Sequence, residues 1–171
     1  MVAIAGRSEN SKGRPLAGAF RVPFVIGLDA LAATRPEAVV EAASHDAVRE
    51  YALPLLARGV SFVALSGGAL CDDALRGRLE RAAAQHHALL YVPSGGIGGL
   101  DVLKAACMAG AGKVSIAVTK PPAAWKGIPY VEKLGLDMDR LTAATVLFEG
   151  SARDGVPHFP ANVNIAAVLS M

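Results

Sequence analysis

Cysteine is nearly absent from this 171-residue sequence, which contains only Cys71 and Cys107. Two thiols without metal-ligand spacing form neither a disulfide framework nor a zinc site, so disulfide-stapled and zinc-binding small domains are excluded. We expect both cysteines to be small buried hydrophobic residues. Their scarcity indicates a protein of the reducing cytoplasm.

Long hydrophobic runs and an excess of one charge are also lacking. Although 53% of the residues are hydrophobic, no apolar run approaches the roughly 20 residues that a membrane-spanning helix needs. The start at Met1 has neither the charged region nor the cleavage site of a signal peptide. A formal net charge of +2, with scattered Lys and Arg, excludes the basic surface typical of nucleic-acid and membrane binding. The composition predicts a soluble globular protein whose partner is a small molecule.

What the sequence does contain is an alternation of short apolar runs with longer segments of helical periodicity. Strands are predicted at residues 2–5, 38–43, 60–65 and 89–92. Between them, one helix is expected from a Ser44 cap to a stop at Gly59, and another over residues 72–85. This alternation is typical of βαβ units and predicts the α/β class, with a parallel sheet buried on both faces.

The pattern changes after Pro93, where a Gly-rich turn opens a predicted helix over residues 100–108. Strands are expected at 113–119 and 145–148, and the prolines in residues 120–127 predict a loop between them. We therefore predict a domain boundary near Pro93, which divides residues 1–93 from residues 94–171.

Open α/β sheets bind ligands at the C-terminal ends of their strands, so the residues after each strand are candidates. Arg7 and Ser8 follow the first strand, where such side chains can hold a 2′-phosphate and favour NADP over NAD; a solvated turn is the alternative. Small residues such as Ala43 after the second strand let a nicotinamide nucleotide lie against the backbone. Ser66, after the third, opens a loop of accessible amides that also resembles a plain turn.

Three further features can carry chemistry. His45, in the first turn of a predicted helix, is either an acid or base or simply an exposed residue. The Gly-rich turn around Gly96 can bind a cofactor or carboxylate through its amides, although it is not a GxGxxG fingerprint. Asn162 and Asn164 can cap a helix or bind a nicotinamide carboxamide.

Several motifs in series resemble the L-aspartate dehydrogenase family. They are YVPSGGIGGLD at 91–101, KPPAAW at 120–125, LFEGSA at 147–152 and FPANVN at 159–164, with a likeness that extends upstream through 40–44 and 65–70. The resemblance implies a partial NAD(P)-binding Rossmann-type domain over 1–93, followed by part of an α+β substrate and catalytic domain over 94–171. A family member would have another strand and a GxGxxG turn before Val2, so the phosphate-binding turn is expected to be missing.

The resemblance also implies an activity, namely the oxidation of L-aspartate to iminoaspartate with NAD or NADP, which feeds NAD biosynthesis. It implies a cytoplasmic homo-oligomer without nucleic-acid or membrane partners. By motif, Gly96, where the family usually has Ala, and one asparagine, Asn164 in preference to Asn162, would contact the cofactor. None of the four histidines matches the catalytic His of the family, which is expected beyond Met171.

We therefore expect a fragment of a dehydrogenase, truncated at both ends. The alternatives are a shortened homologue that binds without catalysing, and a different enzyme that uses the Gly-rich loop for a phosphorylated substrate. Loss of an inner strand would expose apolar sheet edges, so the isolated chain is expected to be poorly soluble or oligomeric.

Overall fold

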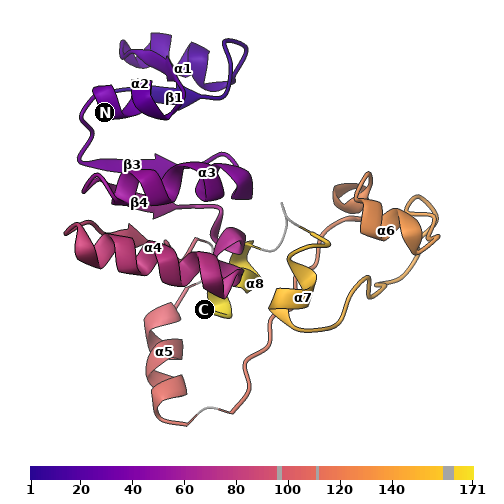
Figure 1. The fold of residues 1–171 in the computed structure, drawn as a ribbon. Helices are drawn as coiled ribbons and strands as arrows, with labels where there is room; N and C mark the ends of the chain where they lie inside the picture. Colours follow the sequence, from indigo (N-terminus) through magenta and orange to yellow (C-terminus); the bar gives the residue numbers. More distant parts are fainter. Residues whose placement is uncertain (96–97, 111, 160–163) are drawn as a thin grey trace.

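A computed structural model describes residues 1–95, 98–110, 112–159 and 164–171 (Figure 1). The first part of the chain alternates strands and helices: β1 (Ile4–Gly6), α1 (Gly13–Phe20), β2 (Phe24–Ile26), α2 (Leu28–Ala33), β3 (Ala38–Glu41), α3 (His45–Leu56), β4 (Ser61–Ala64), the 3-10 helix η1 (Gly67–Cys71), α4 (Asp73–Gln85) and β5 (Leu90–Tyr91). The later part contains α5 (Leu100–Met108), the 3-10 helix η2 (Pro122–Trp125), α6 (Pro129–Lys133), α7 (Ala152–Gly155) and α8 (Asn164–Leu169).

Both sheets of the described chain are parallel. One pairs β1 with β2, and the other has the order β3-β4-β5. The predicted α/β class is confirmed, as are the four strands foreseen from the apolar runs. The elements α1, β2 and α2 were not predicted, because they are short and this stretch is interrupted by Gly13, Pro15, Gly18 and Gly27.

Helices α3 and α4 begin where the sequence predicts, because each has a side-chain cap. The Ser44 hydroxyl accepts a hydrogen bond from the Ala47 amide at 3.2 Å, and the Asp72 carboxylate accepts one from the Leu75 amide at 3.0 Å. Each cap satisfies an amide that the first helical turn leaves unpaired. The two caps thus set the points where α3 begins after β3 and where α4 begins after η1.

The core lies between the three-stranded sheet and these two helices. Phe62 and Ala64 on β4 are fully buried, whereas Val63 is only partly buried and Val40 on β3 is 63% exposed. One face of the sheet is therefore packed and the other is open. The expectation of a sheet buried on both faces was wrong for the described residues, because α3 and α4 pack against each other over the same strands.

The two sheets are held together by side chains rather than by strand pairing. Leu31 of α2 is buried in the same apolar cluster as α3 and β4, and Val25 of β2 packs against it. An ion pair joins Arg58 to Asp29 at 3.1 Å. Among the described residues, β1 pairs only with β2 and β3 pairs only with β4. Each of β1 and β3 therefore forms one edge of its sheet.

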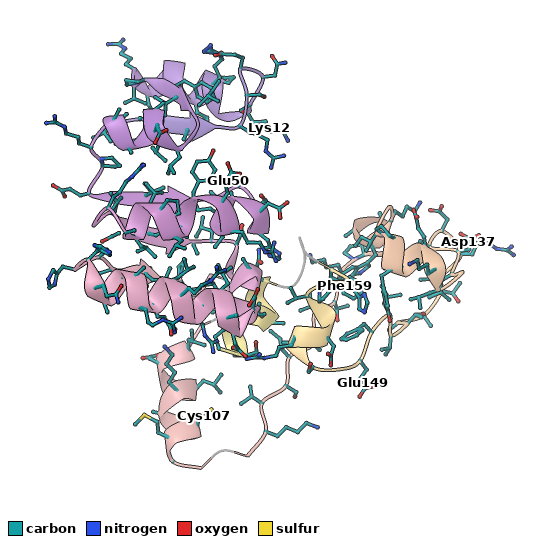
Figure 2. All side chains as sticks on the ribbon, viewed as in Figure 1. Lys12, Glu50, Cys107, Asp137, Glu149 and Phe159 are labelled. Carbon is teal, nitrogen blue, oxygen red and sulfur yellow. The ribbon has the colours of Figure 1, made fainter. Side chains whose placement is uncertain are left out.

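A second apolar cluster gathers around α6 in the later part of the chain. Trp125, Val131, Met138 and Phe159 are buried there. The rings of Trp125 and Phe159 meet edge to face, with centroids 5.7 Å apart. Figure 2 labels Phe159, which lies to the right of the helices that cover the three-stranded sheet.

The two strands predicted for this region were wrong, because residues 113–119 and 145–148 form no ladder in the structure. A strand is stable only with a hydrogen-bonded neighbour, and these segments have none among the described residues. Part of their apolar character is used otherwise, since Val118, Leu147 and Phe148 pack against the aromatic cluster.

Both cysteines are free, and neither is fully buried. Cys71 is partly exposed in η1, and Cys107 is exposed on α5, which buries none of its residues. The expectation of buried cysteines was wrong for both, and for Cys107 the reason is that α5 has no packed face to receive its side chain. Within the described ranges, we find no helix with the length and apolar character that crossing a bilayer would require.

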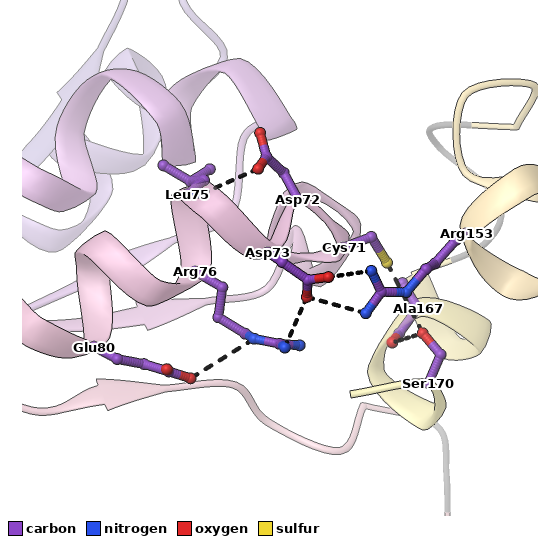
Figure 3. Close-up of polar contacts among 9 residues, drawn as sticks. All are labelled: Cys71, Asp72, Asp73, Leu75, Arg76, Glu80, Arg153, Ala167 and Ser170. Atoms are coloured by element: carbon purple, nitrogen blue, oxygen red, sulfur yellow. Dashed lines mark hydrogen bonds and ion pairs between the residues drawn. The ribbon is translucent and has the colours of Figure 1, made fainter.

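An ion-pair network joins α4 to α7 (Figure 3). The Arg153 guanidinium binds both carboxylate oxygens of Asp73, and Arg76 binds one of them at 2.8 Å. The hydrogen bond from Arg153 is the main cause that lowers the pKa of Asp73 below its ordinary value. This network is the charged link between the first and the later part of the chain.

We expect the network to weaken in acid. A lowered pKa in the folded state stabilises the protein at any pH above the ordinary Asp value of about 3.9, and this contribution is lost as the pH falls through the folded pKa. The melting temperature of Asp73→Asn should therefore lie below that of the wild type at pH 6, and the difference should shrink progressively as the pH falls below the ordinary Asp value of about 3.9. High salt should shrink the difference because the groups are exposed. A difference that stays constant as the pH falls from 6 through the acid range until the wild type unfolds would contradict this assignment.

Candidate functional site

The C-terminal ends of β3 and β4 are tied together by one buried carboxylate. Glu41, the last residue of β3, is 6% exposed and accepts four hydrogen bonds. Two come from the amides of Ala43 and Ser44 at 2.7 and 2.9 Å, and two from the amide and hydroxyl of Ser66 at 3.0 and 2.9 Å. The carboxylate thereby fixes both loops at the edge of the sheet where α/β folds bind ligands.

Helix α8 packs directly against the backbone of η1, although the two lie far apart in sequence. A side chain at Gly67 would place its Cβ 2.8 Å from Val168 and 3.4 Å from Val92. Such distances leave no room for a Cβ, so glycine is needed here for close approach rather than for an unusual backbone angle. This packing carries the start of α8 to the end of β4.

Asn164, the first residue of α8, makes two hydrogen bonds across this contact. Its Oδ1 accepts from the Gly68 amide at 3.2 Å and lies 3.0 Å from His45 Nε2. Asn164 and His45 are both partly buried. The structure therefore brings the predicted residue Asn164 next to the loops that carry Ala43 and Ser66, while Ala43 itself stays exposed on its loop.

Arg7 and Ser8 follow β1 and are both exposed. The Ser8 amide donates to Ser11 Oγ at 3.1 Å, which closes a tight turn before α1. Partial burial, together with Glu50, raises the pKa of Tyr51, and the positive charge of Arg7 opposes this rise. Arg7 thus lies close enough to α3 to act on it electrostatically. A shallow depression lies next to this turn, and its lining is formed by Glu9, Asn10, Ser11, Lys12, Arg14 and Pro15.

The structure describes only part of the Gly-rich turn and only one of the two predicted asparagines. Gly96 and Asn162 lie outside the described residues. On either side of Gly96, the backbone of Gly95 and Gly99 has φ angles of 60° and 68°, which favour glycine, and no side chain or backbone atom crowds their open faces. The described part of the Gly-rich turn is therefore accessible.

The four histidines occupy different environments. His86 and His87 follow Gln85 at the C-terminal end of α4, the position predicted for them. His158 stacks on Tyr130 with ring centroids 4.2 Å apart. His45 was expected to be exposed or an acid or base, but the structure shows it bonded to Asn164. None of them is placed as a free acid or base beside the loops that follow β3 and β4.

Two functional residues had no assigned role in the sequence reading. Glu41 stood within a recognised motif, but its burial depends on Ser66, which comes from the next strand. Gly68 stood in the loop whose amides were predicted to be accessible to a ligand, or else to form a plain turn, whereas its amide donates to Asn164. A signal existed for Glu41, since an acid that ends an apolar strand and precedes small residues is unusual.

Two family models match the chain in succession. Residues 1–93 match the model described as the homoserine dehydrogenase NAD-binding domain, and residues 101–171 match the model described as the C-terminal domain of aspartate dehydrogenase.

Curated proteins that are similar to this chain are named L-aspartate dehydrogenase. An L-aspartate dehydrogenase of Ralstonia nicotianae is 44% identical over 139 residues, which are 81% of this chain and 51% of the relative. An L-aspartate dehydrogenase 2 of Bordetella pertussis is 40% identical over 168 residues, which are 98% of this chain and 62% of the relative. The chain thus spans between about half and three fifths of the length of these curated relatives.

The fold is similar to a crystal structure of aspartate dehydrogenase from Thermotoga maritima. The TM-score is 0.65 at 28% sequence identity, and the match covers 99% of this chain and 72% of the other. The expected order, a Rossmann-type NAD-binding region followed by a C-terminal domain, is thereby confirmed as the fold class.

Proposed function

Because the chain belongs to the L-aspartate dehydrogenase family, we propose that the protein oxidises L-aspartate to iminoaspartate. In this reaction aspartate loses a hydride from its α-carbon and a proton from its amino group, so that a C=N bond forms. A bound NAD(P)+ supplies the hydride acceptor. The imino product is a precursor for the synthesis of NAD.

One observation carries the proposal. Asn164 belongs to the region that matches the aspartate dehydrogenase model, and it accepts a hydrogen bond from the Gly68 amide of η1, which follows β4 in the region that matches the NAD-binding model. The two matched regions therefore meet at the sheet edge where parallel α/β folds bind nucleotides. We accordingly propose the division into a cofactor domain at 1–93 and a substrate domain at 94–171.

The described residues fit a nicotinamide nucleotide at this edge. Ala43 is exposed and small, so a ring can lie against its backbone. Ser66 is buried and both its amide and its hydroxyl donate to Glu41, so its contact with a cofactor stays a prediction. Asn164 keeps a side-chain amino group that makes no hydrogen bond within the described residues. Gly96 and Asn162 remain predicted cofactor contacts. We assign no proton transfer, since none of the histidines lies free at this edge.

We also propose that NADP is preferred to NAD, because Arg7 and Ser8 follow β1 and are exposed to a ligand. Arg7→Ala should weaken NADP+ binding by about 10- to 100-fold, as expected for loss of a charged hydrogen bond of about 1.5–3 kcal/mol, and should change NAD+ binding much less. Titration calorimetry with both cofactors measures this. Arg78→Ala, which removes another exposed arginine, is the matched control. Equal losses for both cofactors would refute a 2′-phosphate contact.

The activity itself is tested by following the absorbance of the reduced cofactor with L-aspartate, L-glutamate and L-alanine as substrates. Turnover with L-aspartate in preference to the other two supports the proposal. Cofactor binding without turnover would instead support a shortened homologue that binds without catalysing. Absence of both would reject the dehydrogenase function for this protein.

We further propose that the protein acts in the cytoplasm as a homo-oligomer. Its two cysteines are unpaired, as suits a reducing compartment. The open edges of β1 and β3 and the exposed side chain of Val40 give surfaces that a second subunit can cover. Light scattering after size exclusion gives the mass, and a monodisperse monomer would contradict the oligomer.

A further inference from the structure

We propose that His45 is a positioning residue, which together with the Gly68 amide orients the Asn164 side chain so that its amino group faces the nicotinamide carboxamide. This inference rests on the proposed function, because it assumes that a nicotinamide nucleotide binds at this edge. The geometry that carries it is the shared acceptor Asn164 Oδ1, which lies 3.2 Å from the Gly68 nitrogen and 3.0 Å from His45 Nε2.

The orientation of the amide follows from the chemistry of its partners. A backbone N–H is always a donor, so the Asn164 atom that faces Gly68 must be the oxygen and not the nitrogen. Asn164 Nδ2 must then lie on the other side of the side-chain plane.

The hydrogen bond to Asn164 also places the proton of His45. Since Asn164 Oδ1 is an acceptor, His45 Nε2 must carry a hydrogen to form the 3.0 Å contact. A His45 Nε2 that donates to an amide oxygen is not available to remove a proton from a substrate. Its position therefore indicates an orienting role rather than acid–base catalysis.

The site has room for this arrangement only because residue 68 is glycine. A Cβ there would lie 2.5 Å from His45 Nε2 and 3.1 Å from Asn164 Oδ1. Any side chain would displace the imidazole from its acceptor. Gly68 thus contributes both an amide donor and the space for a second donor.

The Gly68 amide and His45 Nε2 both donate to Asn164 Oδ1. The two N–H groups of Asn164 Nδ2 remain for a ligand, because neither bonds to a described residue. Such a pair of donors recognises a carbonyl oxygen, and the carboxamide of a nicotinamide presents one. If the amide were free to rotate, its oxygen would face the ligand part of the time and the fixed contact would be lost. Holding Oδ1 in place therefore increases affinity for the nicotinamide part of the cofactor only.

The test compares two ligands on the full-length protein. One is NADP+, and the other is 2′-phospho-ADP-ribose, which lacks the nicotinamide ring. His45→Leu removes the donor at similar size and should weaken NADP+ binding about tenfold, equivalent to roughly 1.4 kcal/mol, without changing the affinity for 2′-phospho-ADP-ribose. His45→Gln, whose amide can donate from nearly the same place, should restore NADP+ affinity to within about threefold of the wild type.

Gly68→Ala provides an independent route to the same effect, and Gly18→Ala is its control, because a Cβ at Gly18 meets no atom within 4 Å. An unchanged NADP+ affinity in His45→Leu overturns the inference, as does an equal loss for both ligands or a failure of His45→Gln to restore NADP+ affinity.

Asn164→Asp keeps an oxygen for both donors but removes the amino group. If Asn164→Asp loses NADP+ affinity while His45→Leu does not, the role of His45 is refuted but the proposed function stands. If the wild type binds neither ligand, both the role of His45 and the proposed function are refuted.

Discussion

Glu41→Ala is expected to lower the free energy of unfolding by about 3 kcal/mol or more, the largest effect of any polar substitution in the described chain. The Glu41 carboxylate is the acceptor for two amides of the loop after β3 and for the amide and hydroxyl of Ser66. Without it, these donors stay buried or half-buried with no partner, at a cost of about 1–3 kcal/mol for each one that water cannot reach.

Glu41→Gln should have a smaller effect, because its amide oxygen can still accept hydrogen bonds. Its amino group, however, would face the Ser66 amide, which donates to Oε2 at 3.0 Å in the wild type. Urea unfolding measures the free energy of unfolding of Glu41→Ala and Glu41→Gln and so ranks their stabilities. Glu37→Ala is the control, because Glu37 is exposed. A Glu41→Ala protein as stable as the control would show that the carboxylate does not hold the two loops.

Phe62→Ala should destabilise the protein by about 3–5 kcal/mol, because it opens a cavity at the centre of the core. Phe62 is fully buried on β4 and lies in register between Val39 of β3 and Leu90 of β5. The middle strand of a three-stranded sheet is fixed on both sides, so the backbone cannot move in to fill the space. Against a usual total stability of about 5–15 kcal/mol, such a loss unfolds a marginal protein.

The matched control is Phe20→Ala, since Phe20 is 62% exposed on α1 and its truncation should change stability by about 0.5 kcal/mol or less. Urea unfolding followed by circular dichroism compares the two variants. If the two phenylalanine substitutions had equal effects, the three-stranded sheet would not be the centre of the core.

Local signals in the sequence suffice for the elements that are stabilised locally. Helices α3 and α4 could be placed because Ser44 and Asp72 are capping residues that stand before apolar periodic segments. The strands β3 and β4 are recognisable because they are short, apolar and followed by small residues. These features depend on neighbours in sequence, so the sequence shows them directly.

The errors arose where structure depends on distant partners. Residues 113–119 have the composition of a strand, but composition does not provide a neighbouring strand to pair with. The burial of Glu41 depends on Ser66, and the role of His45 depends on Asn164, which no local pattern connects. Arg7, Ser8, Ala43 and Ser66 could be nominated from the fold rule alone, and their contacts with a cofactor remain predictions.

The bond between His45 and Asn164 has a consequence for folding kinetics. It joins residues 119 positions apart, so a long loop must close before it forms, and such contacts form late. The earlier strands and helices can assemble first, because their partners are close in sequence. A newly made chain would therefore gain its full affinity for the cofactor only in the last step of folding, when α8 docks on η1. Cofactor should then slow the unfolding of the folded protein. The same cofactor, present during refolding, should not speed the formation of the sheet.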